Sequence, residues 1–173
     1  NIMQRMSGVA TMTDRYQQRL TGLKTKVLDT RKTTPGMRLL EKEAVRIGGG
    51  SNHRIGLFDM ILIKDNHVDF AGGIPQAVAA AKKWCADNGK NLQIELEVRN
   101  TEEIDLALAA GVDRIMLDNF TPARTMEAVT HIRAYKAPDA QLQADSHVHN
   151  GTDVEIESSG GITLDTLRDY GEC

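Results

Sequence analysis

Short β-type runs alternate with longer helical patterns along this chain, and this alternation strongly limits the folds available to it. The spacing of apolar residues predicts helices over residues 2–20, 37–47, 75–88, 101–110, 121–135 and 163–170. Between them, β-type runs cover residues 26–30, 58–63, 92–98, 113–117 and 154–157. Strands separated by helices of about ten residues form parallel βαβ units. We therefore predict an α/β fold built on a parallel sheet.

The size of the chain favours one domain over residues 1–173. Its 173 residues allow one sizeable core, and neither a repeat nor a low-complexity linker divides them. The chain begins directly in a helical pattern and ends where another strand is expected, so the sequence predicts a piece cut at both ends.

Net charge and cysteine content limit the classes of partner and the cell compartment that the sequence allows. The net charge of −3 argues against a nucleic-acid partner, so any basic site must be local. Cys85 and Cys173 form neither a metal motif nor a disulfide framework, which is typical of the reducing cytoplasm. Because every apolar run is shorter than the ~20 residues that cross a bilayer, we expect no membrane partner.

Polar residues lie at the carboxyl end of every predicted strand. In a (β/α) barrel, the strand ends and the loops after them build the active site. We therefore predict an incomplete TIM-like (β/α) barrel with its site at this edge. The polar groups, in strand order, are Asp29, Arg31 and Lys32; residues 64–67; Glu95, Glu97 and Arg99; Asp118 and Asn119; and residues 158–161.

Five basic residues come from three loops at this predicted edge. Arginine binds carboxylates and phosphates in bidentate fashion, whereas lysine binds them as a point charge. Each residue alone also fits a solvated surface charge, and His53 fits an ordinary loop residue equally well. As a group, they suit a ligand with several anionic groups. They are Arg31, Lys32, His53, Arg54 and Lys64.

Carboxylates accompany the cations. Glu95, Glu97 and Arg99 alternate with apolar residues and therefore share one face of a strand. Glu97 and Asp118 offer the hard oxygen ligands that magnesium takes together with substrate phosphates. Two alternatives stay open, a structural ion-pair ladder around Glu95 and salt bridges that neutralise the basic residues.

Two further patterns are less specific. Ser159, Gly160 and Gly161 precede a predicted helix, where backbone N–H groups form a phosphate cradle, although short glycine-rich turns are common. His147 and His149 have the spacing of two metal ligands, but no third ligand accompanies them, so we do not predict a metal site there.

Ordered motifs cover nearly the whole chain, at residues 6–11, 30–36, 49–54, 56–57, 63–67, 94–98, 116–120 and 159–163. They resemble the motifs of the quinolinate phosphoribosyltransferases, the carboxylating nicotinate-nucleotide pyrophosphorylases of the type II phosphoribosyltransferase family. The resemblance implies transfer of phosphoribosyl from phosphoribosyl pyrophosphate to quinolinate with decarboxylation. It implies magnesium as cofactor and nicotinate mononucleotide, pyrophosphate and carbon dioxide as products, in NAD biosynthesis.

The resemblance also implies roles for individual residues. Lys32, Lys64, Glu97 and Asp118 would be catalytic, with Glu97 and Asp118 at the metal. Substrate binding would fall to Arg31, Lys32, His53, Arg54, Lys64, Ser159, Gly160 and Gly161.

In that family a separate N-terminal α/β domain, absent here, completes the site in a homodimer or higher homo-oligomer. We therefore expect these residues alone to be inactive. Two other functions remain open, a related phosphoribosyltransferase acting on nicotinate and a non-catalytic, anion-binding barrel. The number of cationic side chains favours a substrate with two carboxylates.

Overall fold

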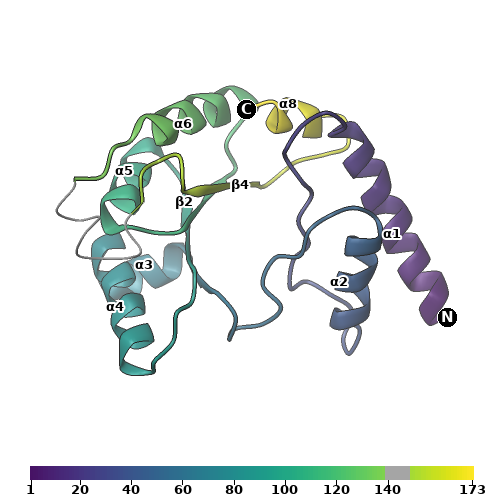
Figure 1. The fold of residues 1–173 in the computed structure, drawn as a ribbon, viewed down its shortest axis with the longest axis horizontal. Helices are drawn as coiled ribbons and strands as arrows, with labels where there is room; N and C mark the ends of the chain where they lie inside the picture. Colours follow the sequence, from purple (N-terminus) through teal and green to yellow (C-terminus); the bar gives the residue numbers. More distant parts are fainter. Residues whose placement is uncertain (139–148) are drawn as a thin grey trace. The chain divides into compact units, whose positions relative to one another are not determined.

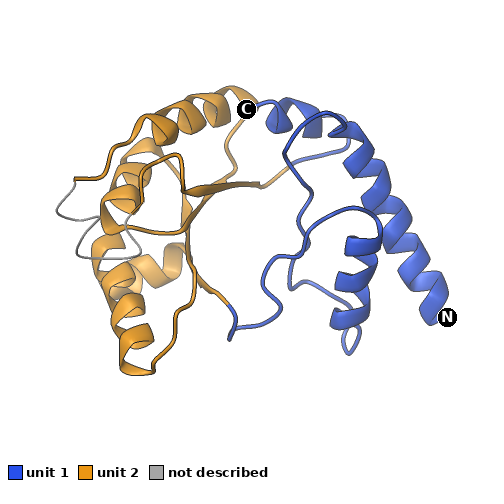
Figure 2. Ribbon diagram, in the orientation of Figure 1, with its two compact units in different colours: residues 1–59, 162–173 blue, residues 60–161 orange. Residues whose placement is uncertain are grey.

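The computed structural model describes residues 1–138 and 149–173 (Figure 1). They form two compact units, unit 1 with residues 1–59 and 162–173, and unit 2 with residues 60–161 (Figure 2). One domain over residues 1–173 stays a prediction, and each unit is described by itself. Every helix in the described ranges is too short or too polar to cross a lipid bilayer.

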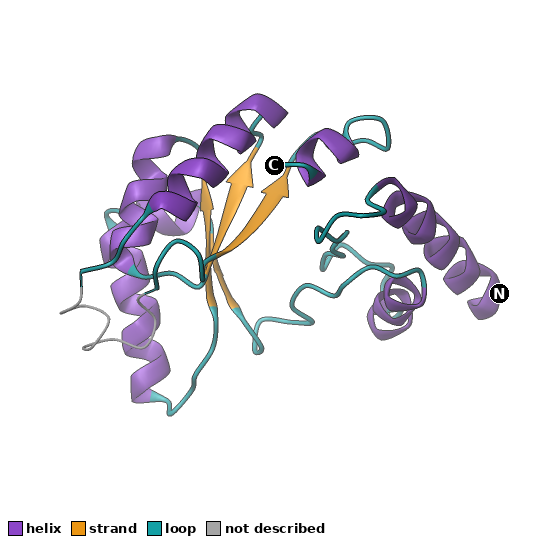
Figure 3. Cartoon of the chain, turned by 45° about the horizontal axis from the view of Figure 1, so that its top comes forward, coloured by secondary structure: helices purple, strands orange, loops and turns teal. Residues whose placement is uncertain are grey.

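Unit 2 contains a parallel sheet of four strands in chain order. The strands are β1 (Ile61–Ile63), β2 (Ile94–Val98), β3 (Arg114–Asp118) and β4 (Glu155–Ser159). Each strand pairs in parallel with the next, and the strands run side by side in Figure 3. Each crossover therefore leads to the neighbouring position in the sheet, as in a (β/α) barrel. The predicted parallel α/β arrangement is confirmed for these strands.

Helices cover one face of this sheet. They are α3 (Asp65–Ala71), α4 (Ile74–Asp87), α5 (Thr101–Ala110) and α6 (Pro122–Ala134). Leu96 and Ile115 are fully buried on this face and share one core with Ile104 and Ile132 of the helices. Because side chains alternate along a strand, residues at odd positions of β2 point to the other face. That alternation places Glu95 and Glu97 away from the helices.

One local prediction in unit 2 needs correction. Helix α3 was not predicted, because the polar residues 64–67 were interpreted only as a strand end. Lys64 is its N-cap residue, and the Lys64 N–H donates to Nδ1 of His67 (3.0 Å). The N-cap of α5 is Asn100, whose side chain accepts the N–H of Glu103 (2.9 Å). Gly111 ends α5 in the left-handed conformation that favours glycine.

Unit 1 is built on α1 (Ile2–Arg19), α2 (Arg38–Ile47) and α8 (Leu167–Gly171). The predicted strand at residues 26–30 is reduced to one parallel bridge between Leu28 and Ser51. Helix α8 begins later than predicted, because Thr163 and Thr166 form a hydrogen-bonded turn before it. Gly48 lets α1 approach the end of α2, since a Cβ there would lie 2.4 Å from the carbonyl oxygen of Ala10.

Glu41 joins α2 to α1 and to the loop before α2. Its carboxylate accepts from Arg5 Nε (2.8 Å) and from the Thr34 N–H (3.1 Å). The hydrogen bonds from Thr34 and Arg5 outweigh burial and lower the pKa of Glu41. A carboxyl with a lowered pKa in the folded state stabilises the fold above its unfolded pKa of about 4.3, and this contribution disappears as the pH falls through the folded value.

We expect Glu41→Gln to lower the free energy of unfolding at pH 7 by about 1.5–3 kcal/mol, because hydrogen bonds to a charged acceptor are lost. As the pH falls below about 4.3 and through the lowered folded pKa, the difference from the wild type should shrink, since the wild-type carboxylate becomes protonated too. Urea unfolding at both pH values measures this. Glu43→Gln is the control, because Glu43 pairs at the surface with Arg46 of the same helix. An effect of Glu41→Gln that is equal at both pH values would contradict the assignment.

Candidate functional site

The predicted cations of unit 1 lie on two loops that meet next to a short backbone pairing. Arg31 and Lys32 follow the bridge residue Leu28, and His53 and Arg54 follow its partner Ser51. The Ser51 N–H donates to the Val27 carbonyl (2.8 Å), and the Asp29 N–H donates to the Ser51 carbonyl (3.2 Å). This pairing brings Arg31, Lys32, His53 and Arg54 into one region of unit 1.

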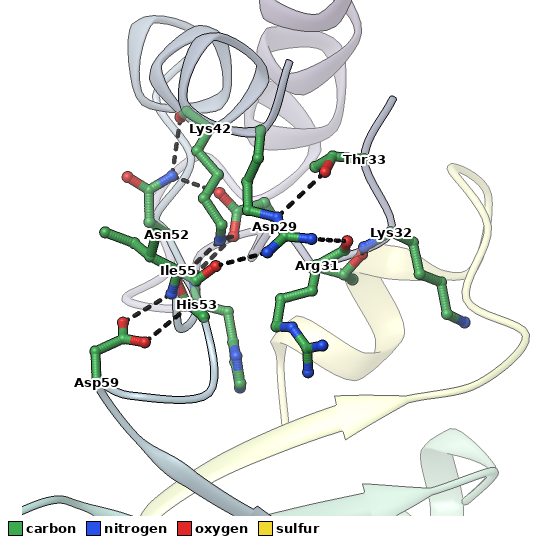
Figure 4. A network of polar contacts seen from close by, with 12 residues as sticks. Asp29, Arg31, Lys32, Thr33, Lys42, Asn52, His53, Ile55 and Asp59 are labelled. Atoms are coloured by element: carbon green, nitrogen blue, oxygen red, sulfur yellow. Dashed lines mark hydrogen bonds and ion pairs between the residues drawn. The ribbon is translucent and has the colours of Figure 1, made fainter. Parts of the chain in front are cut away.

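A buried carboxylate fixes the second loop. Asp29 accepts from the Lys42 ammonium, from the Asn52 side-chain amide and from the His53 N–H (2.9 Å), and these residues converge in Figure 4. The Lys42 ammonium also donates to the His53 carbonyl (2.9 Å). The side chains of Lys42 and Asp29 are only 4% and 7% exposed. His53 is therefore held at both ends of its backbone by one buried ion pair.

Asp59 closes the same loop. Its carboxylate accepts the N–H groups of Ile55 (2.7 Å) and Gly56 (2.9 Å). Burial alone would raise the pKa of Asp59, but these backbone N–H groups, with the charge of Lys42, outweigh it and lower the pKa. An ionised side chain thus stabilises the turn after Arg54.

The side chains of Arg31 and Lys32 point away from the Asp29 network (Figure 4). Lys32 is exposed and Arg31 is half-buried. Within the described ranges, the buried Nε of Arg31 has no hydrogen-bond acceptor. An unsatisfied buried donor is costly, and an anionic ligand would satisfy it. Arg31 is therefore the cation of this unit whose geometry points most clearly to a ligand.

The other predicted site residues lie at the carboxyl edge of the sheet in unit 2. Lys64 follows β1, Glu97 lies in β2, Asp118 ends β3 and Ser159 ends β4. Lys64 Nζ lies 2.6 Å from Oε2 of Glu97, and the Glu97 side chain is only 13% exposed. The predicted cation and carboxylate are thus an ion pair at the sheet edge.

Asn119 connects the ends of β3 and β4. Its backbone is left-handed, with a φ of 55°, its N–H donates to the Ser159 carbonyl (2.8 Å), and its Nδ2 donates to Oδ2 of Asp118 (2.8 Å). Gly160 lies directly against it, because a Cβ on Gly160 would be 2.1 Å from Oδ1 of Asn119. Gly161 has no such neighbour within 4 Å.

We expect Gly160→Ala to destabilise unit 2 more than Gly161→Ala does. Both glycines have positive φ, 97° and 67°, so either substitution costs about 1–2 kcal/mol of backbone strain. Only Gly160→Ala also displaces Asn119. Urea unfolding of the two variants measures the difference. Equal losses of stability would show that the contact with Asn119 contributes nothing to the free energy of unfolding.

One charged residue at the start of β3 was not predicted to form contacts. Arg114 was overlooked, although it alternates with Met116 and Asp118 along β3. It pairs with Glu155 and lies 3.6 Å from Oε2 of Glu157. Burial alone would lower the pKa of Arg114, but the hydrogen bond to Glu155 and the charges of Glu95 and Glu157 raise it. Arg114 therefore pairs with two carboxylates of β4, while an ion-pair ladder through Glu95 stays one alternative.

Arg99 lies beyond the end of β2 and pairs with Glu103 (2.6 Å), which raises the pKa of Arg99.

Nε2 of His149 lies 3.1 Å from Oδ1 of Asp113. His147 lies outside the described residues, so the spacing of the two histidines is not tested.

Parallel βαβ units with charged groups at the carboxyl edge define an incomplete (β/α) barrel. The model of the family "Quinolinate phosphoribosyl transferase, C-terminal domain" matches residues 9–173, and the chain belongs to this family. The chain is 43% identical to the probable carboxylating nicotinate-nucleotide pyrophosphorylase of Bacillus subtilis, over 96% of the chain and 50% of that protein. It is 42% identical to the chloroplastic carboxylating enzyme of Oryza sativa, over 99% of the chain and 45% of that protein.

A solved structure agrees with this assignment. The nicotinate-nucleotide pyrophosphorylase from Francisella tularensis has a TM-score of 0.81 and 42% identity, covering 96% of this chain and 52% of that one. The predicted fold class and family are confirmed. The chain spans about half the length of the curated relatives it matches.

Proposed function

We propose that the complete protein transfers phosphoribosyl from phosphoribosyl pyrophosphate to quinolinate, with decarboxylation, in NAD biosynthesis. Family membership supports the reaction class. The observation that carries the choice of substrate is the group of cations on the two loops of unit 1, with the buried Nε of Arg31 lacking an acceptor among the described residues. A pyridine with two adjacent carboxylates supplies several acceptors to such a group.

The binding roles follow the family resemblance. Arg31, Lys32, His53, Arg54 and Lys64 would hold the quinolinate carboxylates and the nearby phosphates. Backbone N–H groups of the Ser159–Gly160–Gly161 segment would bind the 5-phosphate, and the fixed position of Gly160 against Asn119 supports a preorganised backbone there.

The reaction requires charge stabilisation and no nucleophilic side chain. The pyridine nitrogen forms the bond to the ribose carbon while the carbon–oxygen bond to pyrophosphate breaks, and the electron pair leaves with pyrophosphate. Glu97 would stabilise the positive charge that develops on the ribose, and Lys32 and Lys64 would stabilise anionic oxygens. The adjacent ring carboxylate then leaves as carbon dioxide, and the ring carbon takes up a proton. The cationic pyridinium ring accommodates the electron pair left behind.

The carboxylates at the sheet edge suit magnesium. In the described residues, hydrogen bonds engage Oε2 of Glu97 and Oδ2 of Asp118, so the other oxygen of each side chain remains for a metal ion. One or two carboxylates with substrate phosphates are the ligand set that magnesium takes. Magnesium bound there would stabilise negative charge on the leaving pyrophosphate.

The direct test is an assay of the complete protein with quinolinate, phosphoribosyl pyrophosphate and magnesium. We expect one carbon dioxide released for each nicotinate mononucleotide formed. Turnover of nicotinate in place of quinolinate would instead indicate the related phosphoribosyltransferase. Binding of quinolinate without turnover would indicate a non-catalytic, anion-binding barrel.

We also propose that the protein acts in the cytoplasm as a homodimer or higher homo-oligomer, without a nucleic-acid or membrane partner. The scarcity of cysteines supports a cytoplasmic location, and the acidic net charge argues against a nucleic-acid partner. Family resemblance supports the homo-oligomer. Analytical ultracentrifugation of the complete protein tests the oligomeric state. A monomer with full activity would contradict the proposed homo-oligomer.

A further inference from the structure

Arg38, the first residue of α2, connects the two loops that carry the cations of unit 1. Its Nη2 donates to the Arg31 carbonyl (3.3 Å), and its Nη1 donates to the Ile55 carbonyl (3.3 Å). Its Nε donates to Oγ1 of Thr33 (3.3 Å). The accepting residues Arg31, Thr33 and Ile55 are drawn in Figure 4. One half-buried guanidinium therefore reaches the backbone of both loops.

The acceptors of Arg38 lie directly beside the ligand-binding candidates. The carbonyl of Arg31 precedes the peptide bond to Lys32, and the carbonyl of Ile55 lies one residue after Arg54. A shift of either carbonyl would therefore move a cationic side chain. Each of the three side-chain nitrogens of Arg38 already has a protein acceptor, so its hydrogen bonds hold the two loops and not a ligand.

A forked donor suits this connection. The guanidinium is planar and presents its N–H groups in fixed directions, whereas an ammonium is a compact point charge. The neighbouring Lys42 shows the difference, because its ammonium serves Asp29 and the His53 carbonyl, which belong to one compact network. Arg38 instead bridges the loop at Arg31–Thr33 and the loop at Ile55.

We propose that Arg38 is a positioning residue that sets the spacing between the cations of the two loops, Arg31 and Lys32 on one and Arg54 on the other. Bidentate recognition of a rigid dianion needs its partners within about 0.5 Å of their productive positions. The part of this inference that concerns pyridine dicarboxylate rests on the proposed function. The part that concerns the two loops does not.

The binding test uses calorimetric titration of the complete protein with pyridine-2,3-dicarboxylate. Arg38→Met should weaken binding about tenfold or more, and Arg38→Lys should restore only a small part of it. Arg46→Met is the matched control on the same helix, because Arg46 is exposed and pairs with Glu43. We expect its affinity within about twofold of the wild type.

A double-mutant cycle separates positioning from a general loss of structure. If Arg38 acts partly through Arg31, Arg38→Met should weaken binding by a smaller factor in a protein that already carries Arg31→Ala than in the wild type, because contacting residues are not additive. Fully additive effects of the two substitutions would overturn the proposal.

Amide hydrogen exchange gives a readout that is independent of any substrate. In Arg38→Met, exchange should accelerate at least about fivefold in residues 30–34 and in residues 53–57, while α4 to α6 stay unchanged. Unchanged exchange in either loop would overturn the positioning role. If both loops exchange faster but the wild type does not bind pyridine dicarboxylate, the positioning role stands and the proposed function fails.

Discussion

Lys64→Ala is expected to lower kcat/KM for quinolinate by about 100- to 1000-fold in the complete protein, the loss typical of removing one preorganised electrostatic group from an active site. Lys64 is placed for this role by β1 before it and by α3 after it, and its Nζ lies 2.6 Å from Oε2 of Glu97. Removing the ammonium leaves a carboxylate without its partner where anionic substrate groups are expected to bind. The substrate then faces repulsion in place of attraction.

Steady-state kinetics with quinolinate and with phosphoribosyl pyrophosphate measures this effect. Lys83→Ala is the control, because Lys83 is 75% exposed and pairs only across one helical turn with Asp87. The Lys64 ammonium is partly exposed, so Lys64→Ala should cost less than about 1 kcal/mol of stability. Turnover close to the wild-type value in Lys64→Ala would remove Lys64 from the catalytic group.

Lys42→Met is expected to lower the free energy of unfolding by about 3–5 kcal/mol, the cost typical of breaking a buried ion pair by removing one partner. Among the described residues, the buried Asp29 carboxylate would then have two donors left, the Asn52 amide and the His53 N–H. The His53 carbonyl would also lose its donor. The effect is large because the two ionised groups are almost completely excluded from water.

Equilibrium unfolding in urea measures the Lys42 effect. Lys26→Met, at an exposed lysine of the same unit, should stay within about 0.5 kcal/mol of the wild type. In the double variant Asp29→Asn with Lys42→Met, the loss should be smaller than the sum of the single losses, because the uncompensated charge is absent. A cost below about 1 kcal/mol for Lys42→Met alone would contradict a structural role for this pair.

The buried pair also shows why part of the site could not be predicted. In α2, the apolar residues Leu39 and Ile47 are exposed, while Glu41 and Lys42 are buried beside Ala44 and Val45. A pattern based on hydrophobicity places charged residues outside, and only the positions of Asp29 and Arg5 reveal that these charges have buried partners. Those partners are distant in sequence, so no local pattern contains them.

The sheet was more predictable than the loops. Val98, Leu117 and their neighbours lie in apolar runs bounded by helices, and four of the predicted runs correspond to β1–β4. The run at residues 26–30 has similar composition but forms only the bridge at Leu28, because a strand also needs a paired neighbour. Helix α3 was missed because one segment, residues 64–67, both ends a strand and begins a helix.

The predicted site residues were found by their place after strands. That criterion predicts where a residue lies in the fold, but it does not predict which residue it pairs with. It located Lys64 and Glu97 but did not indicate that they pair. It passed over Arg114, which lies at the start of β3 and not at its carboxyl end. Arg38 was passed over for another reason. Its role depends on the carbonyls of Arg31 and Ile55, which no sequence motif marks.

The central claim is that the cations of the two loops in unit 1 recognise a pyridine dicarboxylate. Calorimetric titration of the complete protein with quinolinate and with nicotinate, in the wild type and in Arg31→Ala, tests it most directly. We predict saturable binding of quinolinate that is at least about tenfold tighter than that of nicotinate, and loss of this preference in Arg31→Ala. Equal affinity for the two pyridines in the wild type, or an unchanged preference in Arg31→Ala, would contradict the claim.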